Sequence, residues 1–158
     1  MTEPHRDVTL DLETPDSADA LACRAAYFEE LARLFSEGFD RAAGQAARDD
    51  DMRPPTGAFV LARRDGTPVG CGGFCRFDER SAEVKRMWTS PTARGLGVAR
   101  RILREIERRA REAGYASIRL DTNRALREAI AFYRKEGYRE IARYNDNPYA
   151  DYWFEKPL

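Results

Sequence analysis

The sequence predicts an α/β (α+β) fold in which helices flank a central, mixed, mostly antiparallel sheet. Two strand-length runs, residues 58–62 and 69–74, flank the hairpin signal Arg64-Asp65-Gly66-Thr67, and a third run at residues 83–89 continues an antiparallel series. A glycine turn then leads into an amphipathic helix, followed by strand, helix, strand and strand. With an earlier strand and helix, the predicted order is β-α-loop-β-β-β-α-β-α-β-β.

The first elements are a strand and a capped helix. Residues 8–12 alternate in polarity as a strand does, and Thr14-Pro15-Asp16-Ser17 supplies an N-cap. We expect Gly38 to end the helix, whose apolar face is marked by Leu21, Ala25, Phe28, Ala32 and Phe35. Residues 39–55 are predicted to be irregular or weakly helical.

The acidic triplet Asp49-Asp50-Asp51 falls in this irregular stretch. A solvated loop is the expected structure, and attraction of a cationic amine substrate is the alternative.

The central segment runs from strand to glycine turn to helix. Ser90-Pro91 ends the strand at residues 83–89, and Arg94-Gly95-Leu96-Gly97 lets the backbone turn close to a ligand. The glycines at residues 70–73 of the preceding strand indicate close backbone approach. Helical spacing gives the next segment one apolar stripe, made of Ala99, Ile102, Leu103, Ile106, Ala110 and Ala113.

The last third of the chain contains one more strand and helix and a closing strand pair. Residues 116–122 form the strand, which ends at Asn123. Gly137 ends the following helix, which carries Ala129, Phe132, Tyr133 and Glu136. Residues 138–142 and 152–155 form the closing pair, joined by a polar and aromatic loop.

Length and composition exclude several classes of protein. At 158 residues we expect one domain, 1–158, with a core of about 8–158. Acidic and basic residues balance at 27 each, and the arginines of the long helix alternate with acids, so we expect a solvated face and no nucleic-acid partner. No apolar run is long enough to cross a membrane and no secretory signal is present, so we expect a cytoplasmic protein.

The cysteines and the single histidine leave little room for metal chemistry. Cys23, Cys71 and Cys75 lack C-x-x-C spacing and are expected to be free, buried thiols. His5 lies in a polar tail, so neither a metal site nor a histidine-based triad is expected.

The glycine turn before a helix is suited to bind phosphate. The first N–H groups of a helix have no intrahelical partner and lie at the positive end of its dipole. A P-loop would end in Gly-Lys-Ser/Thr, whereas this turn ends Gly97-Val98-Ala99. A Rossmann site would have glycine or alanine where Arg100 stands, and Lys85 and Arg86 in the strand argue against a buried parallel strand.

A third pattern, Arg/Gln-x-x-Gly-x-Gly/Ala, is matched by Arg94, Gly97 and Ala99. Three further features accompany this pattern: the order of elements, Glu83 eleven residues before Arg94, and Phe132-Tyr133-x-x-x-Gly137 after Asn123. Together they make the chain resemble the GNAT superfamily of acyl-CoA-dependent N-acetyltransferases from about residue 8 to its end.

The resemblance implies acetyl-CoA as co-substrate, without a metal, and an amine as acceptor. It implies a bulge that splays the strand at residues 83–89 from the strand at residues 118–123, leaving backbone groups free to bond the pantetheine arm. The cofactor-binding residues that it implies are Met87, Trp88, Thr89, Arg94, Gly95, Leu96, Gly97, Val98, Ala99, Arg100 and Asn123.

The resemblance also implies catalytic roles. The N–H of Met87 would polarise the acetyl carbonyl, and Tyr133 would be the general acid for the leaving thiolate. A helix-face aromatic with its hydroxyl bound elsewhere is the alternative for Tyr133. Glu83 is the candidate general base, with a salt bridge to Lys85, Arg86 or a neighbouring strand as its alternative.

The acceptor is not defined by the sequence beyond an amine. The fold would build its site from residues 35–55 and 144–153, where Tyr144 and Tyr149 are candidate substrate-binding residues. Tyr152 and Trp153 would extend an aromatic wall or pack the last hairpin, and Asp146 or Asp151 would attract an ammonium group. A non-catalytic acyl-CoA-binding module is the alternative function, and a monomer or homodimer is expected.

Overall fold

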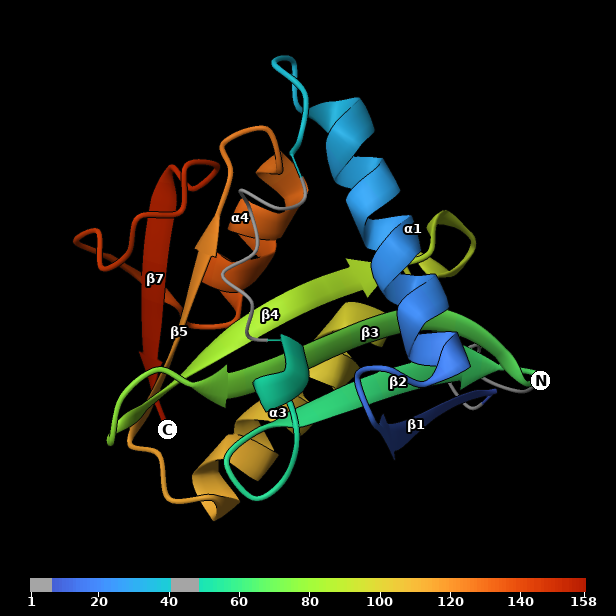
Figure 1. The fold of residues 1–158 in the computed structure, drawn as a ribbon, viewed down its shortest axis with the longest axis horizontal. Coiled ribbons are helices and arrows are strands. Elements are labelled where there is room, and N and C mark those ends of the chain that lie inside the picture. The colour runs from blue at the N-terminus through green and yellow to red at the C-terminus, as the bar shows by residue number, and fades with distance from the viewer. Residues whose placement is uncertain (1–6, 41–48) are drawn as a thin grey trace.

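In the computed structural model, which describes residues 7–40 and 49–158, seven strands form one sheet in the order β1-β2-β3-β4-β5-β7-β6 (Figure 1). Neighbouring strands are antiparallel except β4 and β5, which are parallel. The mixed, mostly antiparallel sheet predicted from the sequence is therefore confirmed. The strands are β1 (Val8–Glu13), β2 (Ala58–Arg64), β3 (Thr67–Arg76), β4 (Ser81–Thr89), β5 (Ser117–Thr122), β6 (Arg139–Ile141) and β7 (Tyr152–Pro157).

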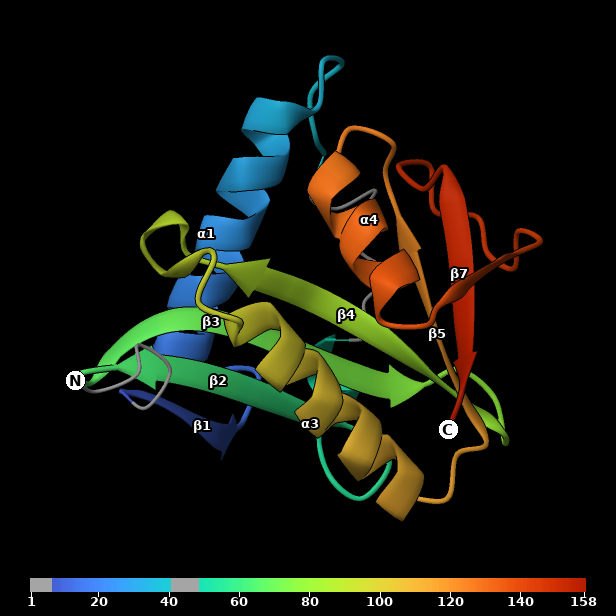
Figure 2. The ribbon, with the colours of Figure 1, turned by 180° about the vertical axis from the view of Figure 1, so that it is seen from behind.

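The described helices cover both faces of the sheet. Helix α1 (Ala18–Leu34) crosses the face seen in Figure 1, whereas α3 (Val98–Glu112) and α4 (Arg127–Lys135) lie on the opposite face, seen in Figure 2. Two short 3₁₀ turns, η1 (Asp49–Asp51) and η2 (Pro91–Ala93), precede β2 and α3. Strands β4 and β5 therefore lie at the centre of the sheet, between helices of both layers.

Helix α1 begins where the sequence predicts, but its end and its buried face differ from the prediction. The Ser17 side chain accepts a hydrogen bond from the Ala20 N–H at 3.1 Å, which confirms the predicted N-cap. The prediction that Gly38 ends the helix is wrong, because α1 stops at Leu34. The predicted apolar face is also partly wrong: Leu21 and Ala32 are exposed, and the buried row is Ala20, Cys23, Phe28 and Leu31. Two overlapping stripes at helical spacing run along α1, and the one that contains Ala20, Cys23, Phe28 and Leu31 packs against the sheet.

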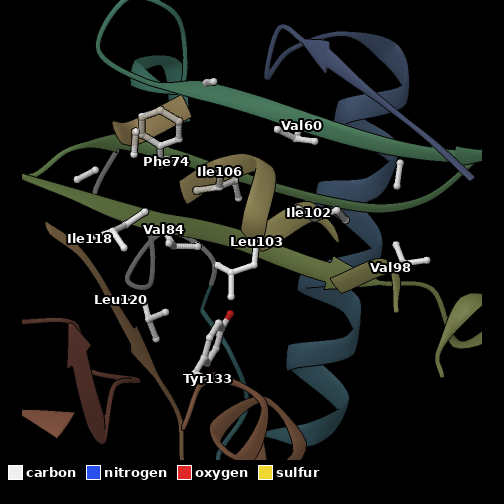
Figure 3. Packing of buried hydrophobic residues seen from close by; sticks show 14 of the residues in the cluster. Val60, Phe74, Val84, Val98, Ile102, Leu103, Ile106, Ile118, Leu120 and Tyr133 are labelled. Atoms are coloured by element: carbon white, nitrogen blue, oxygen red, sulfur yellow. The ribbon is translucent and has the colours of Figure 1, made fainter. Parts of the chain in front are cut away.

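The larger core lies between the sheet and helices α3 and α4. Figure 3 shows Ile102, Leu103 and Ile106 of α3 pointing toward the strands, and Tyr133 of α4 directed toward Leu103 in the same cluster. Ile102, Leu103 and Ile106 are fully buried, so the stripe predicted for this helix is confirmed in its central part. Burying a side chain of this size stabilises the fold by roughly 1.5–3 kcal/mol.

A second, smaller core lies under α1 and contains all three cysteines, each a buried free thiol as predicted. Glycines of β3 let the layers come close. A Cβ on Gly72 would lie 2.4 Å from Met87 Sδ, and one on Gly73 would lie 2.5 Å from Met52 Sδ. The close approach that the sequence predicted at these glycines is confirmed.

Candidate active site

Strands β4 and β5 part near the middle of the sheet. Their parallel pairing covers only Ser81–Glu83 and the residues opposite, up to Arg119. On its other side, β4 places two residues, Arg86 and Met87, against the single Gly72 of β3, which is a β-bulge. Beyond Glu83 the β5-facing edge of β4 has no ladder partner, so its backbone groups are available to a ligand. The bulge and the splay are both where the sequence resemblance implied them.

A cavity of about 100 Å³ lies in this opening. Its walls come from α1 with Phe39, from residues 84–87 of β4, from residues 120–122 at the end of β5 with Asn123 after it, from α4 and from the loop before β7. Of the residues implied as functional, Met87, Asn123, Tyr133 and Tyr149 are brought together here. The cavity walls do not include Glu83 or Tyr144, nor Trp88, Thr89 and the turn at residues 94–100.

The glycine turn has the geometry expected of a phosphate-binding loop. Gly95 and Gly97 have φ of +82° and +76°, a region that residues with a Cβ rarely adopt. Gly97 is the N-cap of α3, and no side chain caps this end of the helix. The first N–H groups of α3 are therefore open to an anion at the positive end of the helix dipole.

The two arginines of this turn already have partners. Arg94 donates through Nε to the Thr89 carbonyl at 3.2 Å and forms an ion pair with Glu30 of α1. Arg100 donates through Nε to Glu136 at 2.7 Å. Both side chains are nearly half exposed, so these surface pairs stabilise the fold little and leave the guanidinium groups near the turn.

Tyr133 is buried on α4 and lines the cavity. Figure 3 shows its hydroxyl group directed from α4 toward the sheet. Burial is the main cause that raises the pKa of Tyr133 above the usual value for a phenol, and Tyr27 and Asp121 add to the shift. The phenol therefore stays protonated at neutral pH, which is the state that a hydrogen-bond donor or general acid needs.

Glu83 is buried and has two close partners. Lys85 Nζ lies 2.9 Å from Glu83 Oε1, and the Tyr144 hydroxyl donates to Oε2 at 2.7 Å. The structure thus contains the salt bridge that was the alternative to a catalytic role. Burial and the Glu83 charge raise the pKa of Tyr144, so this phenol is also neutral. Tyr144 bonds to Glu83 and packs edge-on against Phe77, at 4.9 Å between ring centroids.

Asn123 and Tyr149 are bonded to each other in the cavity wall. Asn123 Nδ2 donates to the Tyr149 carbonyl at 2.7 Å, and Asn123 Oδ1 accepts from the Ala125 N–H at 2.8 Å. The Tyr149 ring lies between Phe35 and Phe39, with centroid distances of 5.6 and 4.8 Å. Of the predicted aromatic wall, Tyr149 alone lines the cavity. Tyr152 stacks on Phe154, and Trp153 Nε1 donates to Asn145 Oδ1 at 2.9 Å.

Asp121, which the sequence analysis did not single out, is a carboxylate in the cavity wall. Asn145 Nδ2 donates to its Oδ2 at 2.6 Å and Asn147 Nδ2 to its Oδ1 at 3.2 Å. Burial, and to a smaller extent the negative charge of Glu83, raises the pKa of Asp121. A polar residue that alternates with Leu120 and Thr122 looks like a solvent-facing strand position in the sequence, which is why it was missed.

The acidic residues proposed to attract an amine lie elsewhere. Asp146 is fully exposed beside Arg143, and Asp151 accepts from the Arg124 N–H at 2.9 Å. The solvated loop predicted for the acidic triplet is wrong for Asp49, whose side chain is only 13% exposed and pairs with Arg24 and Arg86. Because these arginines come from α1 and β4, the sequence pattern around Asp49 contained no signal of the pairing.

Two further observations concern metals and membranes. Among the residues outside the stretches 1–6 and 41–48, no group of three or more His, Cys, Asp or Glu side chains is arranged to hold a metal ion. Over the same described part of the chain, no helix is long and apolar enough to cross a membrane.

Comparison with known proteins places these features in a family context. Residues 24–138 match the sequence model of the Acetyltransferase (GNAT) family. The chain is 37% identical over 134 residues to an IAA acetyltransferase of Azospirillum brasilense, covering 82% of this chain and 87% of the relative. It is also similar to the structure of an acyl-CoA N-acyltransferase from Klebsiella pneumoniae subsp. pneumoniae, with 26% identity, a TM-score of 0.76, and 96% and 97% of the two chains covered.

The fold is shared with a further solved structure. A GNAT family acetyltransferase from Elizabethkingia anophelis, crystallised with acetyl-CoA bound, has a TM-score of 0.67 and 14% identity, with 96% of this chain and 99% of that chain covered.

Proposed function

This chain belongs to the GNAT acetyltransferase family, and from that premise we propose that it transfers the acetyl group of acetyl-CoA directly to a primary amine in a ternary complex. The observation that carries the proposal is the cavity where β4 parts from β5, lined by Met87 at the bulge and by Tyr133. The dinucleotide-binding alternative is wrong, because the family uses acetyl-CoA. The non-catalytic acyl-CoA-binding module remains the competing function.

The chain's own groups fit acetyl-CoA at both ends of the opening. The uncapped start of α3 and the turn at residues 94–100 would hold the pyrophosphate through backbone N–H groups. The unpaired β4 edge, with Met87, Trp88 and Thr89, would bond the pantetheine arm. Asn123 would contribute from β5 by exchanging its bond to Tyr149 for one to the ligand.

The transfer needs three tasks from the protein. The amine nitrogen attacks the acetyl carbon, negative charge develops on the carbonyl oxygen, and the carbon–sulfur bond breaks as the nitrogen loses a proton. The Met87 N–H would stabilise the carbonyl oxygen, a contribution that is typically worth two to three orders of magnitude in rate. Tyr133 would donate a proton to the leaving sulfur, for which its raised pKa keeps it protonated.

We propose that Glu83 is the general base that takes the proton of the amine. Of the two neighbouring carboxylates, Glu83 and Asp121, it is Asp121 that reaches the cavity. The two carboxylates interact, since the charge of Glu83 contributes to the raised pKa of Asp121. Lys85, bonded to Glu83 and also in the cavity wall, balances part of their charge. Tyr144 would act through Glu83, and Tyr149 would bind the acceptor side of the cavity.

The test is amine-dependent release of thiol from acetyl-CoA. Purified protein is incubated with acetyl-CoA and a panel of primary amines, and the products are identified by mass spectrometry. We expect an increase of about 42 mass units on at least one amine, the mass that an acetyl group adds, with one thiol released for each amide formed. Binding of acetyl-CoA with no product from any amine class would favour the non-catalytic module.

A further inference from the structure

Arg86 occupies an unusual backbone position. It lies in the bulge of β4 with φ of +61°, where glycine is the usual residue. A side chain at positive φ is strained, and such strain is found where the residue has a task that glycine cannot perform. The strained position therefore indicates a task for the Arg86 side chain.

The guanidinium group of Arg86 is buried and only partly satisfied. Its side chain is 8% exposed, its Nε donates to Asp49 Oδ1 at 3.0 Å, and it lies 5.0 Å from the ring centroid of Phe28. Asp49 also pairs with Arg24, so two guanidinium groups share one carboxylate. Among buried side-chain atoms of the described residues, only Arg24 Nε and Arg86 Nη2 have no hydrogen-bond partner.

These two unsatisfied donors differ in one respect. Arg86 lines the cavity at the β4–β5 opening, and Arg24 does not. Buried donors without partners are rare in folded proteins, because each one loses its bond to water without replacement. A ligand oxyanion in the cavity would supply the missing acceptor, and arginine is the side chain best suited to carboxylate and phosphonate groups.

The cavity also offers the opposite charge. Asp121 lies in the β5 wall while Arg86 lies in the β4 wall, and Lys85, which also lines the cavity, is already paired with Glu83. Phe35, Phe39 and Tyr149 form an apolar and aromatic wall. A molecule that has both a cationic amine and an anionic group, joined by an apolar body, is complementary to this arrangement.

We propose that the acceptor amine carries an oxyanion, as an amino acid or an aminophosphonate does, and that Arg86 Nη2 donates to that oxyanion while the amine faces Asp121. The proposal rests on the proposed acetyl transfer and specifies the class of its acceptor. Arg86 would then determine specificity, with its guanidinium group held at the cavity wall by Asp49 and Phe28.

The first test compares acceptors that differ only in the charge. Glycine, leucine and phenylalanine are each assayed beside their carboxamides, which keep the amine and remove the anion. We expect kcat/KM to favour the best amino acid over its amide by about tenfold or more, the value of a hydrogen bond to a charged group. The matching 1-aminophosphonates distinguish carboxylate from phosphonate as the preferred oxyanion. Equal or better use of the amides throughout would overturn the proposal.

The second test uses matched variants of the shared ion cluster. Arg86→Gln removes the donor in the cavity, and Arg24→Gln removes the other arginine bound to Asp49, outside the cavity. We expect Arg86→Gln to abolish the preference for the anionic acceptor, and Arg24→Gln to retain it. Arg86→Lys keeps the charge without the planar fork and should recover part of the preference. A shift of the acetyl-CoA KM alone in Arg86→Gln would overturn the assignment.

A binding measurement separates failure of this inference from failure of the proposed function. Phenylacetate and phenylacetamide carry no amine, so their binding to protein saturated with CoA is measured by calorimetry without any turnover. If no amine is acetylated, the proposed function fails, yet binding of phenylacetate to the parent protein and not to Arg86→Gln would still establish the anion site. Equal affinity for phenylacetate and phenylacetamide would refute it.

Discussion

Replacing Gly97 by alanine should weaken acetyl-CoA binding far more than it weakens the fold. Gly97 has φ of +76°, and a Cβ built there meets no atom within 4 Å, so the cost is conformational and not steric. Holding alanine in this region costs about 1–2 kcal/mol. At this chain length each kcal/mol lowers the melting midpoint by roughly 2–4 °C.

The effect on binding follows from the position of Gly97 at the uncapped start of α3. If the strained turn relaxes and one N–H no longer reaches the pyrophosphate, a hydrogen bond to a charged group is lost, which is worth about 1.5–3 kcal/mol. We therefore expect the Kd for acetyl-CoA, measured by calorimetry, to rise roughly 10- to 100-fold.

Gly114→Ala is the matched control. Gly114 follows the other end of α3 with φ of +97°, and a Cβ there also meets no atom within 4 Å. It should lose a similar amount of stability with an unchanged Kd for acetyl-CoA. Equal loss of affinity in the two variants, or none in either, would refute the assignment of the turn as the phosphate site.

Three other predictions test the site and the fold. Tyr133→Phe should lower kcat by roughly 100-fold or more with little change in the acetyl-CoA Kd, as expected for loss of a general acid, and a change within about twofold would remove Tyr133 from the mechanism. The value of kcat/KM should rise with pH as Asp121 ionises through its raised pKa. Glu83→Gln removes a negative neighbour of Asp121, so with the same acceptor this acidic limb of the pH profile should move to lower pH. An unchanged limb and an unchanged rate would exclude the carboxylate pair. Leu31→Ala should cost about 2–5 kcal/mol in chemical denaturation, whereas Leu21→Ala should stay within about 0.5 kcal/mol because Leu21 is 45% exposed, and the reverse order would restore the predicted face of α1.

Local sequence signals predicted much of the fold because they act within a few residues. Asp65 and Gly66 both have positive φ, so the hairpin between β2 and β3 is the one that its turn residues indicate. The glycine turn and the stripe on α3 likewise depend on spacing along one segment. On α1 the same reasoning failed, because two stripes satisfy helical spacing and only packing against the sheet decides between them.

The residues at the cavity were predictable only where the family resemblance identified them. Tyr133, Met87 and the bulge followed from the motif, and the structure brings the two residues to one cavity. Arg86 and Asp121 were not predicted, because their surroundings are assembled from distant segments. Asp49 reaches Arg86 from η1, and Asn145 and Asn147 reach Asp121 from the loop before β7. No pattern within one strand reports such partners.

The most direct test of the account is amide hydrogen exchange with and without acetyl-CoA, read by peptide mass spectrometry. The co-substrate is proposed to lie between β4 and β5 and at the start of α3. Acetyl-CoA should therefore slow exchange in peptides that cover residues 84–89 and 97–101, and leave the β2–β3 hairpin unchanged. Protection of other segments, with exchange at β4 and the α3 N-terminus unaffected, would contradict it.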